Sequence, residues 1–240
     1  MKQRQRRPPG NPDRAWLEAR LPRAADLLVY GRLADELDEL APETLWRELR
    51  AAAEPYLAGG PERTASLHRR VDALLDALTA RDQRFGYPPP FCHKGCCNCC
   101  HEVVYCTSEE AAGIHRHCRA AGIAIDYPRL ERQLRHLETD ADQDHTGATT
   151  WNDQPGPDQA CAFLDPRDGS CTIWPVRPLV CRVHLAEETD AHCRPHNGRE
   201  DPAAKGISYL EVSYLLSAVF TIHRDSIRKT LGRLLLDLRP

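Results

Sequence analysis

The sequence predicts a mainly α-helical protein whose N- and C-terminal segments surround an irregular, cysteine-rich centre. In the segments before residue 90 and after residue 206, apolar residues recur every three or four positions, which is the period of an amphipathic helix. All eleven cysteines lie between Cys92 and Cys193, in a stretch rich in turn-forming residues. We therefore expect helix packing to organise the two ends and the cysteines to organise the centre.

Length and charge limit the classes of protein to consider. The 240 residues suffice for one large domain or two small ones. With 35 acidic residues against 32 Lys and Arg, the chain lacks the basic excess of a nucleic-acid-binding or membrane-surface protein. The longest uncharged apolar-rich run, residues 212–222, is too short to span a bilayer. We expect no nucleic-acid or membrane partner, and a protein partner stays open.

The N-terminal end indicates the compartment. Residues 1–12 are basic and then rich in Pro and Gly, and no apolar stretch of a secretory signal follows them. We expect a disordered basic tail there and a cytoplasmic protein. In a reducing cytoplasm, clustered cysteines act as metal ligands or redox thiols more often than as disulfides. The odd number of cysteines, eleven, is consistent with this interpretation.

Residues 13–90 are predicted to form an N-terminal helical region. Asp13 is expected to cap a first helix, and Pro42 to open a second one that the glycine pair 59–60 ends. Apolar residues spaced by three and four over residues 67–78 predict a third helix. Nothing in this region indicates catalysis, so we expect it to serve packing or partner binding.

Further helices are predicted on the C-terminal side of the first cysteine cluster. Thr107 and Glu110 have the spacing of a capping box, and the helix that they open should end at Gly122. Pro128 is expected to open the next helix. A helical pattern begins again at Ile207. We expect the C-terminal region, residues 201–240, to pack on the rest of the chain.

The cysteine region, residues 91–200, contains two groups of thiols. The first reads CHKGCCNCC over residues 92–100, and gaps of two or three residues let one bend direct several thiolates at one metal ion. Gly95 supplies the backbone freedom for that bend. The second group is spaced by ten, ten and twelve residues, with the turn signal DPRDG at 165–169 between its first two members.

Eight thiols are the candidate metal ligands, and they would complete one multinuclear site or two tetrahedral sites. The candidates are Cys92, Cys96, Cys99, Cys100, Cys161, Cys171, Cys181 and Cys193. Successive side chains of extended backbone face opposite ways, so Cys99 and Cys100 could not both bind one metal ion from an extended segment. Either the chain turns sharply at Asn98, or the two thiolates serve different metals.

These segments resemble the YkgJ-type cysteine-cluster proteins, the zinc- or iron-chelating CxxCxxCC family. The first segment matches through Cys92, Cys96, Cys99 and Cys100. Residues 161–184, CAFLDPRDGSCTIWPVRPLVCRVH, resemble the signature C-P-F-L…G-x-C-x-I-Y…R-P-x-x-C-R. The chain departs from that pattern at Ala162 and Trp174 and by a three-residue first gap. The resemblance implies metal or iron–sulfur binding, and a related group, the flagellin lysine methylases, makes an enzyme conceivable.

Several neighbouring residues are candidates for supporting roles. Arg177 and Arg182 flank Cys181, and we expect them to bind the cofactor by stabilising the negative charge of its thiolates. Cys106 and Cys118 are expected to be ordinary buried thiols. The role of Cys97 stays open, as do those of four histidines near the cysteines. These histidines are His101, His184, His192 and His196.

Three functions remain in competition. The first is a protein that holds iron, as an iron–sulfur cluster or as iron alone, for redox or enzymatic use. The second is a structural zinc module that supports protein interaction, since thiolate ligands suit zinc and iron alike. The third is a metal-dependent modifying enzyme related to lysine methylases, which would need an open coordination position. We favour iron–sulfur, because eight thiolates exceed the needs of one structural zinc ion.

Overall fold

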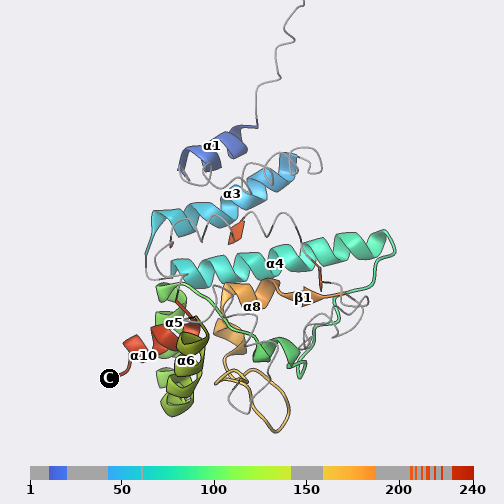
Figure 1. Ribbon diagram of the computed structural model, residues 1–240. Helices are drawn as coiled ribbons and strands as arrows, with labels where there is room; N and C mark the ends of the chain where they lie inside the picture. Colours follow the sequence, from blue (N-terminus) through green and yellow to red (C-terminus); the bar gives the residue numbers. More distant parts are fainter. Residues whose placement is uncertain are drawn as a thin grey trace, which may run out of the picture. The chain divides into compact units, whose positions relative to one another are not determined.

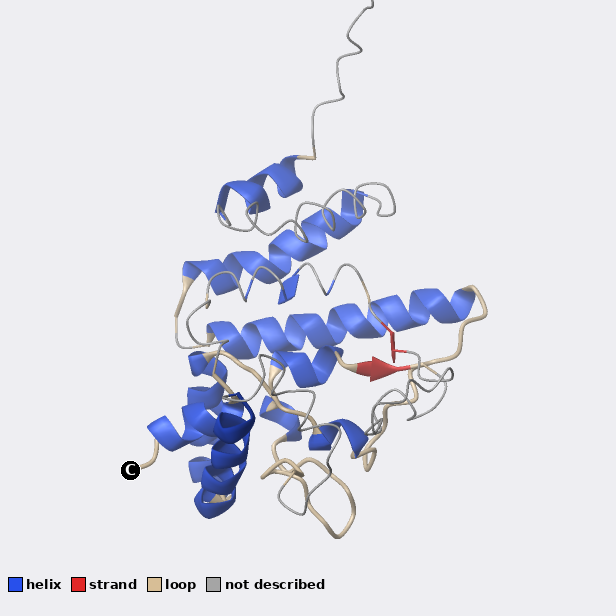
Figure 2. Cartoon of the chain, viewed as in Figure 1, coloured by secondary structure: helices blue, strands red, loops and turns tan. Residues whose placement is uncertain are grey.

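The computed structural model of the chain is mainly α-helical, as predicted (Figures 1 and 2). It describes residues 11–20, 43–60, 62–141, 159–187, 206–207, 209, 212, 215–216, 219, 223 and 229–240. Within these ranges the strands are β1 (Leu185–Ala186) and β2 (Gly206–Ile207), which pair antiparallel. The helices are α1 (Pro12–Arg20), α3 (Glu43–Ala58), α4 (Arg63–Arg84), η2 (Asn98–His101), α5 (Ser108–Ala121), α6 (Tyr127–Ala141), η3 (Trp174–Val176), α8 (Leu179–Val183) and α10 (Leu231–Asp237).

The chain divides into two compact units, and the first comprises Met1–Val71 and Tyr209–Ile222. In this unit α1 packs on α3, where Arg50 pairs with Asp13 at 3.0 Å and covers the ring of Trp16 at 4.6 Å. The cap of α1 differs from the prediction. The side-chain oxygen of Asn11, two residues before Asp13, accepts hydrogen bonds from the backbone N–H groups of Asp13 and Arg14.

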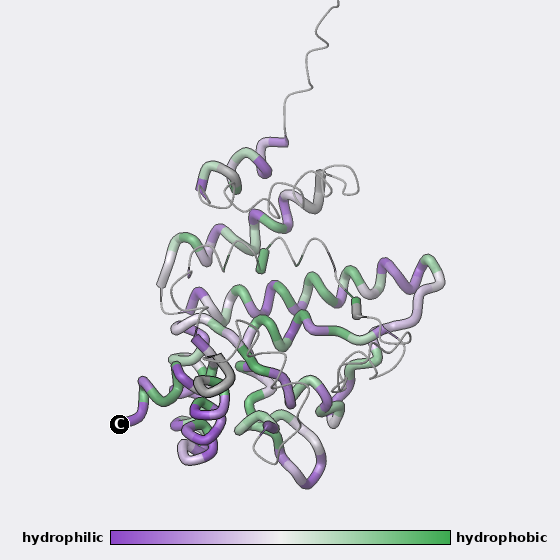
Figure 3. The backbone as a smooth tube through the Cα atoms, in the orientation of Figure 1, coloured by the Kyte–Doolittle hydropathy of each residue, from purple (hydrophilic) through white to green (hydrophobic). Residues whose placement is uncertain are grey.

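The second unit comprises Asp72–Ser208 and His223–Pro240. Here α10 packs against both α5 and α6, and the three helices lie side by side (Figure 1). α6 is largely hydrophilic along its length (Figure 3), and it contributes the buried Leu130 to the shared hydrophobic cluster. The same cluster contains Phe163 and Ile173, so the second cysteine segment is anchored to this helical core.

Local signals placed most of the described helices correctly. Thr107 and Glu110 form the predicted capping box of α5, and Gly122 ends this helix in the left-handed conformation at φ +67°. α6 begins at Tyr127, one residue before Pro128. The helix predicted from Ile207 is wrong at its start, because residues 206–207 pair with β1 as a strand.

The units also differ from the expected regions. Their boundary falls within the continuous helix α4, between Val71 and Asp72, and residues 209–222 are grouped with the N-terminal part of the chain. The expected basic tail, except for its last two residues, lies outside the described residues. In the described part of the chain, no helix combines the length and apolar character that crossing a membrane requires.

Candidate metal centre

The first cysteine segment is shaped by two tight turns. Gly95 adopts φ +90°, a conformation that favours glycine, and the N–H of Cys96 donates to the carbonyl of His93 at 3.1 Å. The short helix η2 then begins at Asn98. The chain therefore turns at Asn98, the first of the two alternatives for Cys99 and Cys100, and both of these thiols line one cavity.

The second cysteine segment folds back on itself at the predicted turn. The N–H of Gly169 donates to the carbonyl of Asp165 at 2.9 Å, and the N–H of Asp165 donates to the carbonyl of Ser170 at 2.8 Å. Leu164 pairs with Cys171 in an isolated antiparallel bridge beside this turn. The turn thereby returns Cys171 to the vicinity of Cys161, although ten residues separate them in the sequence.

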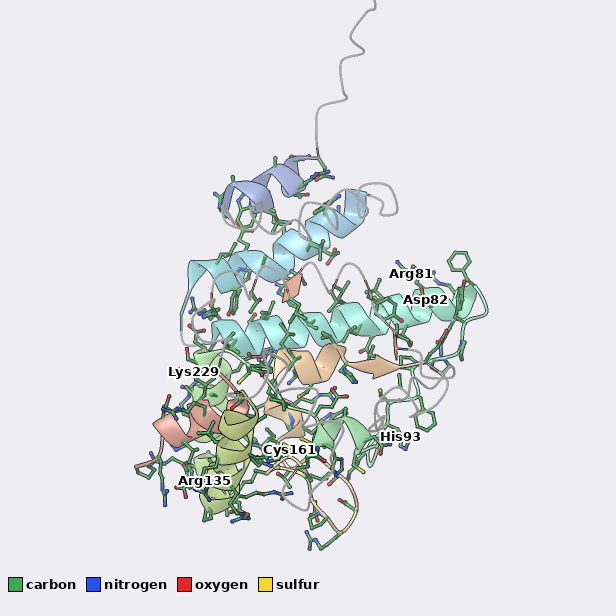
Figure 4. All side chains as sticks on the ribbon, viewed as in Figure 1. Arg81, Asp82, His93, Arg135, Cys161 and Lys229 are labelled. Atoms are coloured by element: carbon green, nitrogen blue, oxygen red, sulfur yellow. The ribbon has the colours of Figure 1, made fainter. Side chains whose placement is uncertain are left out.

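The two segments, on which Figure 4 labels His93 and Cys161, are joined through their backbones. The N–H of Cys161 donates to the carbonyl of Cys100 at 2.6 Å. A second contact brings Gly169 against Gly95, where a Cβ added to Gly169 would lie only 2.8 Å from the Gly95 carbonyl oxygen. Gly169 also has φ +70°, so this position requires glycine for both its conformation and its close contact.

Glu110 fixes the helix that carries Cys181. Its side chain is only 4% exposed, and one carboxylate oxygen accepts from the backbone N–H and the hydroxyl of Thr107 at 2.8 and 3.0 Å. The other oxygen accepts from the N–H of Leu179, the first residue of α8, at 2.6 Å. One buried carboxylate therefore connects the start of α5 to the start of α8.

Arg182 holds the segment that precedes α8. Its buried guanidinium donates to the carbonyls of Pro175 and Arg177, at 2.8 and 3.1 Å, and pairs with Asp72 of α4. Burial raises the pKa of Cys171, and Arg182 opposes this rise less than Arg177 does. The structure thus gives Arg182 a backbone-holding role, and its assignment as a cofactor-binding residue stays a prediction.

Glu110 in this connecting role and Asp72 were not identified from the sequence. The capping-box spacing predicts the contacts of Glu110 with Thr107. It does not predict the contact with Leu179, which is 69 residues away in the sequence. Asp72 is 110 residues from Arg182 and sits in an ordinary amphipathic helix. No local pattern distinguishes either long-range contact.

A single cavity of about 520 Å³ collects the thiols of both segments. Seven of the eight candidate ligands line it, and the eighth, Cys193, lies outside the described residues. No Asp or Glu occurs among the described lining residues. The seven lining thiols are those of Cys92, Cys96, Cys99, Cys100, Cys161, Cys171 and Cys181.

The thiols oppose one another's ionisation. Burial raises the pKa of Cys161 to about 11, and the charges of Cys171 and Cys99 contribute in the same direction. Burial also raises the pKa of Cys181, with further contributions from Cys161, Cys99 and Cys171. The pKa of Cys100 is raised first by its hydrogen bond with Cys99 and then by burial. Several of these groups would become thiolates together only when a cation compensates their charge.

Backbone N–H groups also contact sulfur atoms of the site. The sulfur of Cys92 accepts from the N–H of Ala186 at 3.4 Å. Backbone N–H groups of Phe163 and Ile173 donate to Cys161 and Cys171, and oppose the rise in pKa that burial causes at these two thiols. Hydrogen bonds from backbone amides to sulfur are a known means of tuning thiolate-bound metals.

Arg177 lies at the cavity, as its candidate role requires. Its guanidinium stacks 3.6 Å from the centre of the Trp174 ring, and both residues are part of the lining. Burial raises the pKa of Cys171 and Cys181, and the positive charge of Arg177 opposes that rise. Its assignment as a cofactor-binding residue stays a prediction.

The residues with open roles are distributed differently. His184 lines the cavity. Nδ1 of His101 instead lies 3.2 Å from the carbonyl oxygen of Cys97, four residues earlier in the chain. His192 and His196 are outside the described residues. Cys106 and Cys118 are 0% and 1% exposed within the hydrophobic cluster, which confirms the prediction of buried thiols.

The donor set fits a soft metal, although the thiols are spread around the cavity wall. Throughout the described ranges, no three His, Cys, Asp or Glu side chains have the arrangement that would hold a metal ion. The ten described cysteines are all free thiols. Thiols without carboxylates are the ligands of zinc and iron–sulfur sites rather than of magnesium or calcium.

A helical frame with a cavity lined by free thiols defines a class of metal-binding domain. Residues 91–199 match the CxxCxxCC family, described as "Putative zinc- or iron-chelating domain". The resemblance seen in the sequence is thus confirmed for residues 91–199, which are similar to that family. The match supports metal binding, with zinc or iron as the metal. No curated protein matches the chain, and no solved structure does.

Proposed function

We propose that the protein holds iron on the thiolates of this cavity, as an iron–sulfur cluster or as thiolate-bound iron, for a redox role. The observation that carries the proposal is the presence of seven thiols around one cavity without a carboxylate in its described lining. One tetrahedral zinc ion uses about four ligands. A surplus of thiols favours a centre with more than one metal atom, and iron–sulfur clusters are built on such ligands.

Four thiols are the best candidates for one set of ligands. Each thiol of this set lies near enough to the other three for their charges to interact, so a modest rearrangement of side chains would be needed to bring the four onto one centre. The four are Cys99, Cys161, Cys171 and Cys181. Cys100 interacts with the first three of them, so it is the leading alternative ligand. Cys92, Cys96 and Cys193 remain candidates for a second site.

The protein would tune the bound centre through its own groups. The N–H groups of Phe163 and Ile173 donate to thiolates, and Arg177 places a positive charge beside them. The buried side chains of Phe163 and Ile173 would exclude water on that side. An iron–sulfur cluster, when bound, supplies one-electron transfer.

A structural zinc module is the second candidate, and one observation favours it. The described elements that carry candidate ligands are short, with η2 of four residues and α8 of five. Such short elements gain much of their stability from a bound metal, as in small zinc domains. The zinc and iron proposals therefore predict the same loss of metal when a ligand cysteine is replaced, but different visible absorption.

The deciding experiment is anaerobic purification of the full chain, followed by elemental analysis and visible absorption. The iron proposal predicts stoichiometric iron, acid-labile sulfide if the iron is in a cluster, and visible absorption that bleaches on reduction. A colourless protein with stoichiometric zinc would contradict it and favour the structural module. Protein with neither metal after reconstitution with both would contradict both candidates.

A further inference from the structure

We propose that the thiol-lined cavity also binds a small amphiphilic carboxylate, whose charged end is held by Arg177 and whose apolar part contacts the cavity wall. The inference rests on the proposed metal centre, because it assumes that the thiols are occupied by the metal. It adds a second ligand of stated chemistry to the same cavity.

The size of the cavity is the first support. Its volume of about 520 Å³ lies within the range of roughly 300–1,000 Å³ that is typical of small-molecule sites. A centre held by one group of four thiols occupies only part of a cavity that seven thiols line. Room for an organic molecule would therefore remain beside such a centre.

The composition of the wall is the second support. Apart from the cysteines, apolar side chains form much of the lining, and three of them are contributed by Val104, Ile173 and Leu231. Trp174 adds an aromatic surface that is 46% exposed. Such a wall suits the hydrocarbon part of a ligand, since small-molecule sites are largely apolar with a few well-placed polar groups.

The charge of the lining is the third support. Lys94 and Arg177 are the Lys and Arg residues of the described lining, which contains no described Asp or Glu, so the thiols are its acidic groups. The Nε atom of Arg177 is buried without a hydrogen-bond partner in the structure. An unsatisfied buried donor is unfavourable, so a shift of the Arg177 side chain that brings this N–H to an acceptor on a ligand would be stabilised.

The chemistry of Arg177 favours a carboxylate. Stacking on Trp174 covers the face of the guanidinium, so its N–H groups remain available in the plane of the group. A carboxylate accepts two parallel N–H bonds from such a fork. Inorganic phosphate carries more charge, and moving it into a largely apolar cavity costs more desolvation.

The test uses the full-length, metal-loaded protein and isothermal titration with 3-phenylpropionate. Its uncharged amide and inorganic phosphate serve as comparison ligands. Metal content is measured in every sample. Arg177→Gln removes the charge and the fork, and Arg177→Lys keeps only the charge. Arg167→Gln is the matched control, because Arg167 belongs to the same segment but its side chain is 86% exposed and outside the described lining.

We expect 3-phenylpropionate to bind the unchanged protein, and the amide to bind at least about tenfold more weakly. Arg177→Gln should weaken 3-phenylpropionate binding by a similar factor, Arg177→Lys by less, and Arg167→Gln should leave it unchanged. Equal affinity for acid and amide, tighter binding of phosphate, an unaffected Arg177→Gln variant, or no binding to fully metal-loaded protein would each overturn the inference. Absence of metal from the unchanged protein would instead contradict the proposed function.

Discussion

Glu110 shows how much one residue contributes to the site. Its two carboxylate oxygens accept three hydrogen bonds, two from Thr107 and one from the N–H of Leu179. The side chain is buried, so water cannot replace a lost acceptor. Replacing this carboxylate should therefore disturb both the start of α5 and the position of the helix that carries Cys181.

We expect Glu110→Gln to lower the free energy of unfolding by about 1–3 kcal/mol, because an amide has one acceptor oxygen in place of two. Urea denaturation with parallel metal analysis would measure the effect. Glu131→Gln is the control, since Glu131 pairs with Arg239 at 2.7 Å on the surface. Surface pairs of this kind contribute about 0–1 kcal/mol. Equal losses in the two variants would contradict the buried role of Glu110.

Serine substitution of single cysteines tests the ligand assignment. Cys99→Ser and Cys171→Ser should sharply lower metal content, because serine is a poor replacement for a thiolate at a soft-metal site. Cys118→Ser should keep the metal and cost about 1 kcal/mol of stability, since Cys118 is buried in the hydrophobic cluster. Elemental analysis of the purified variants gives the answer. Full metal content in both Cys99→Ser and Cys171→Ser would show that the assignment is wrong.

At this scale the sequence could predict residue types but not their partners. Clustered cysteines and the arginines beside Cys181 were visible because their spacing is local. The contacts of Glu110 with Leu179 and of Asp72 with Arg182 were not, because both cross between segments far apart in the chain. Candidate metal ligands can be recognised from their local spacing, whereas the residues that hold the ligand segments in place are determined by tertiary structure.

At the scale of elements, the turn at Gly169 determines whether the two cysteine segments meet. We expect Gly169→Ala to lower metal content, because its Cβ would lie 2.8 Å from the Gly95 carbonyl oxygen in addition to requiring an unfavourable φ. Gly122→Ala is the matched control. Gly122 has nearly the same φ, +67°, but no atom lies within 4 Å of an added Cβ.

Both alanine variants should lose about 1–2 kcal/mol of stability, the cost of a left-handed conformation with a side chain. Only Gly169→Ala should also lose metal. Thermal unfolding and elemental analysis distinguish the two effects. Unchanged metal content in Gly169→Ala, at a stability equal to that of Gly122→Ala, would show that the segments do not need this close contact.

The elements that local signals define were predicted well, and the others were not. α5 has a capping box at one end and a left-handed glycine at the other, so its bounds could be stated from the sequence. β2 could not be, because the strand exists only through its pairing with β1, some twenty residues earlier in the chain. For α1, Asn11 and Asp13 are both suitable caps, and the sequence alone did not distinguish them.

At the scale of the whole molecule, metal removal should affect one region more than the others. Residues 91–107 and 159–187, which carry the candidate ligands, are held by short elements and by contacts between the two cysteine segments, whereas α3, α4, α5 and α6 are long helices. We expect chelation to increase proteolytic cleavage between Cys92 and Cys193 while much of the helical circular dichroism remains. Mass spectrometry of the fragments locates the cuts. Unchanged cleavage in that region after verified metal loss would contradict the coupling of metal binding to folding.

The division into compact units follows contacts between distant parts of the chain, whereas the predicted regions follow composition. The proline run at 88–90 marks an obvious change of composition, so the sequence placed a boundary there. The structure places it within α4, whose buried residues Leu67 and Val71 belong to one unit and Leu75 and Leu78 to the other. A continuous helix gives no local sign of such a boundary.

The backbone contact between Gly95 and Gly169 has a consequence for transplanting this centre into another protein. The loop that contains Gly95 and the loop that contains Gly169 fit each other without an intervening side chain. A short cysteine-rich peptide copied from residues 92–100 would carry five thiols but not the surface against which its bend is formed. A functional graft would have to include both loops as a matched pair, together with the helices that set the distance between them.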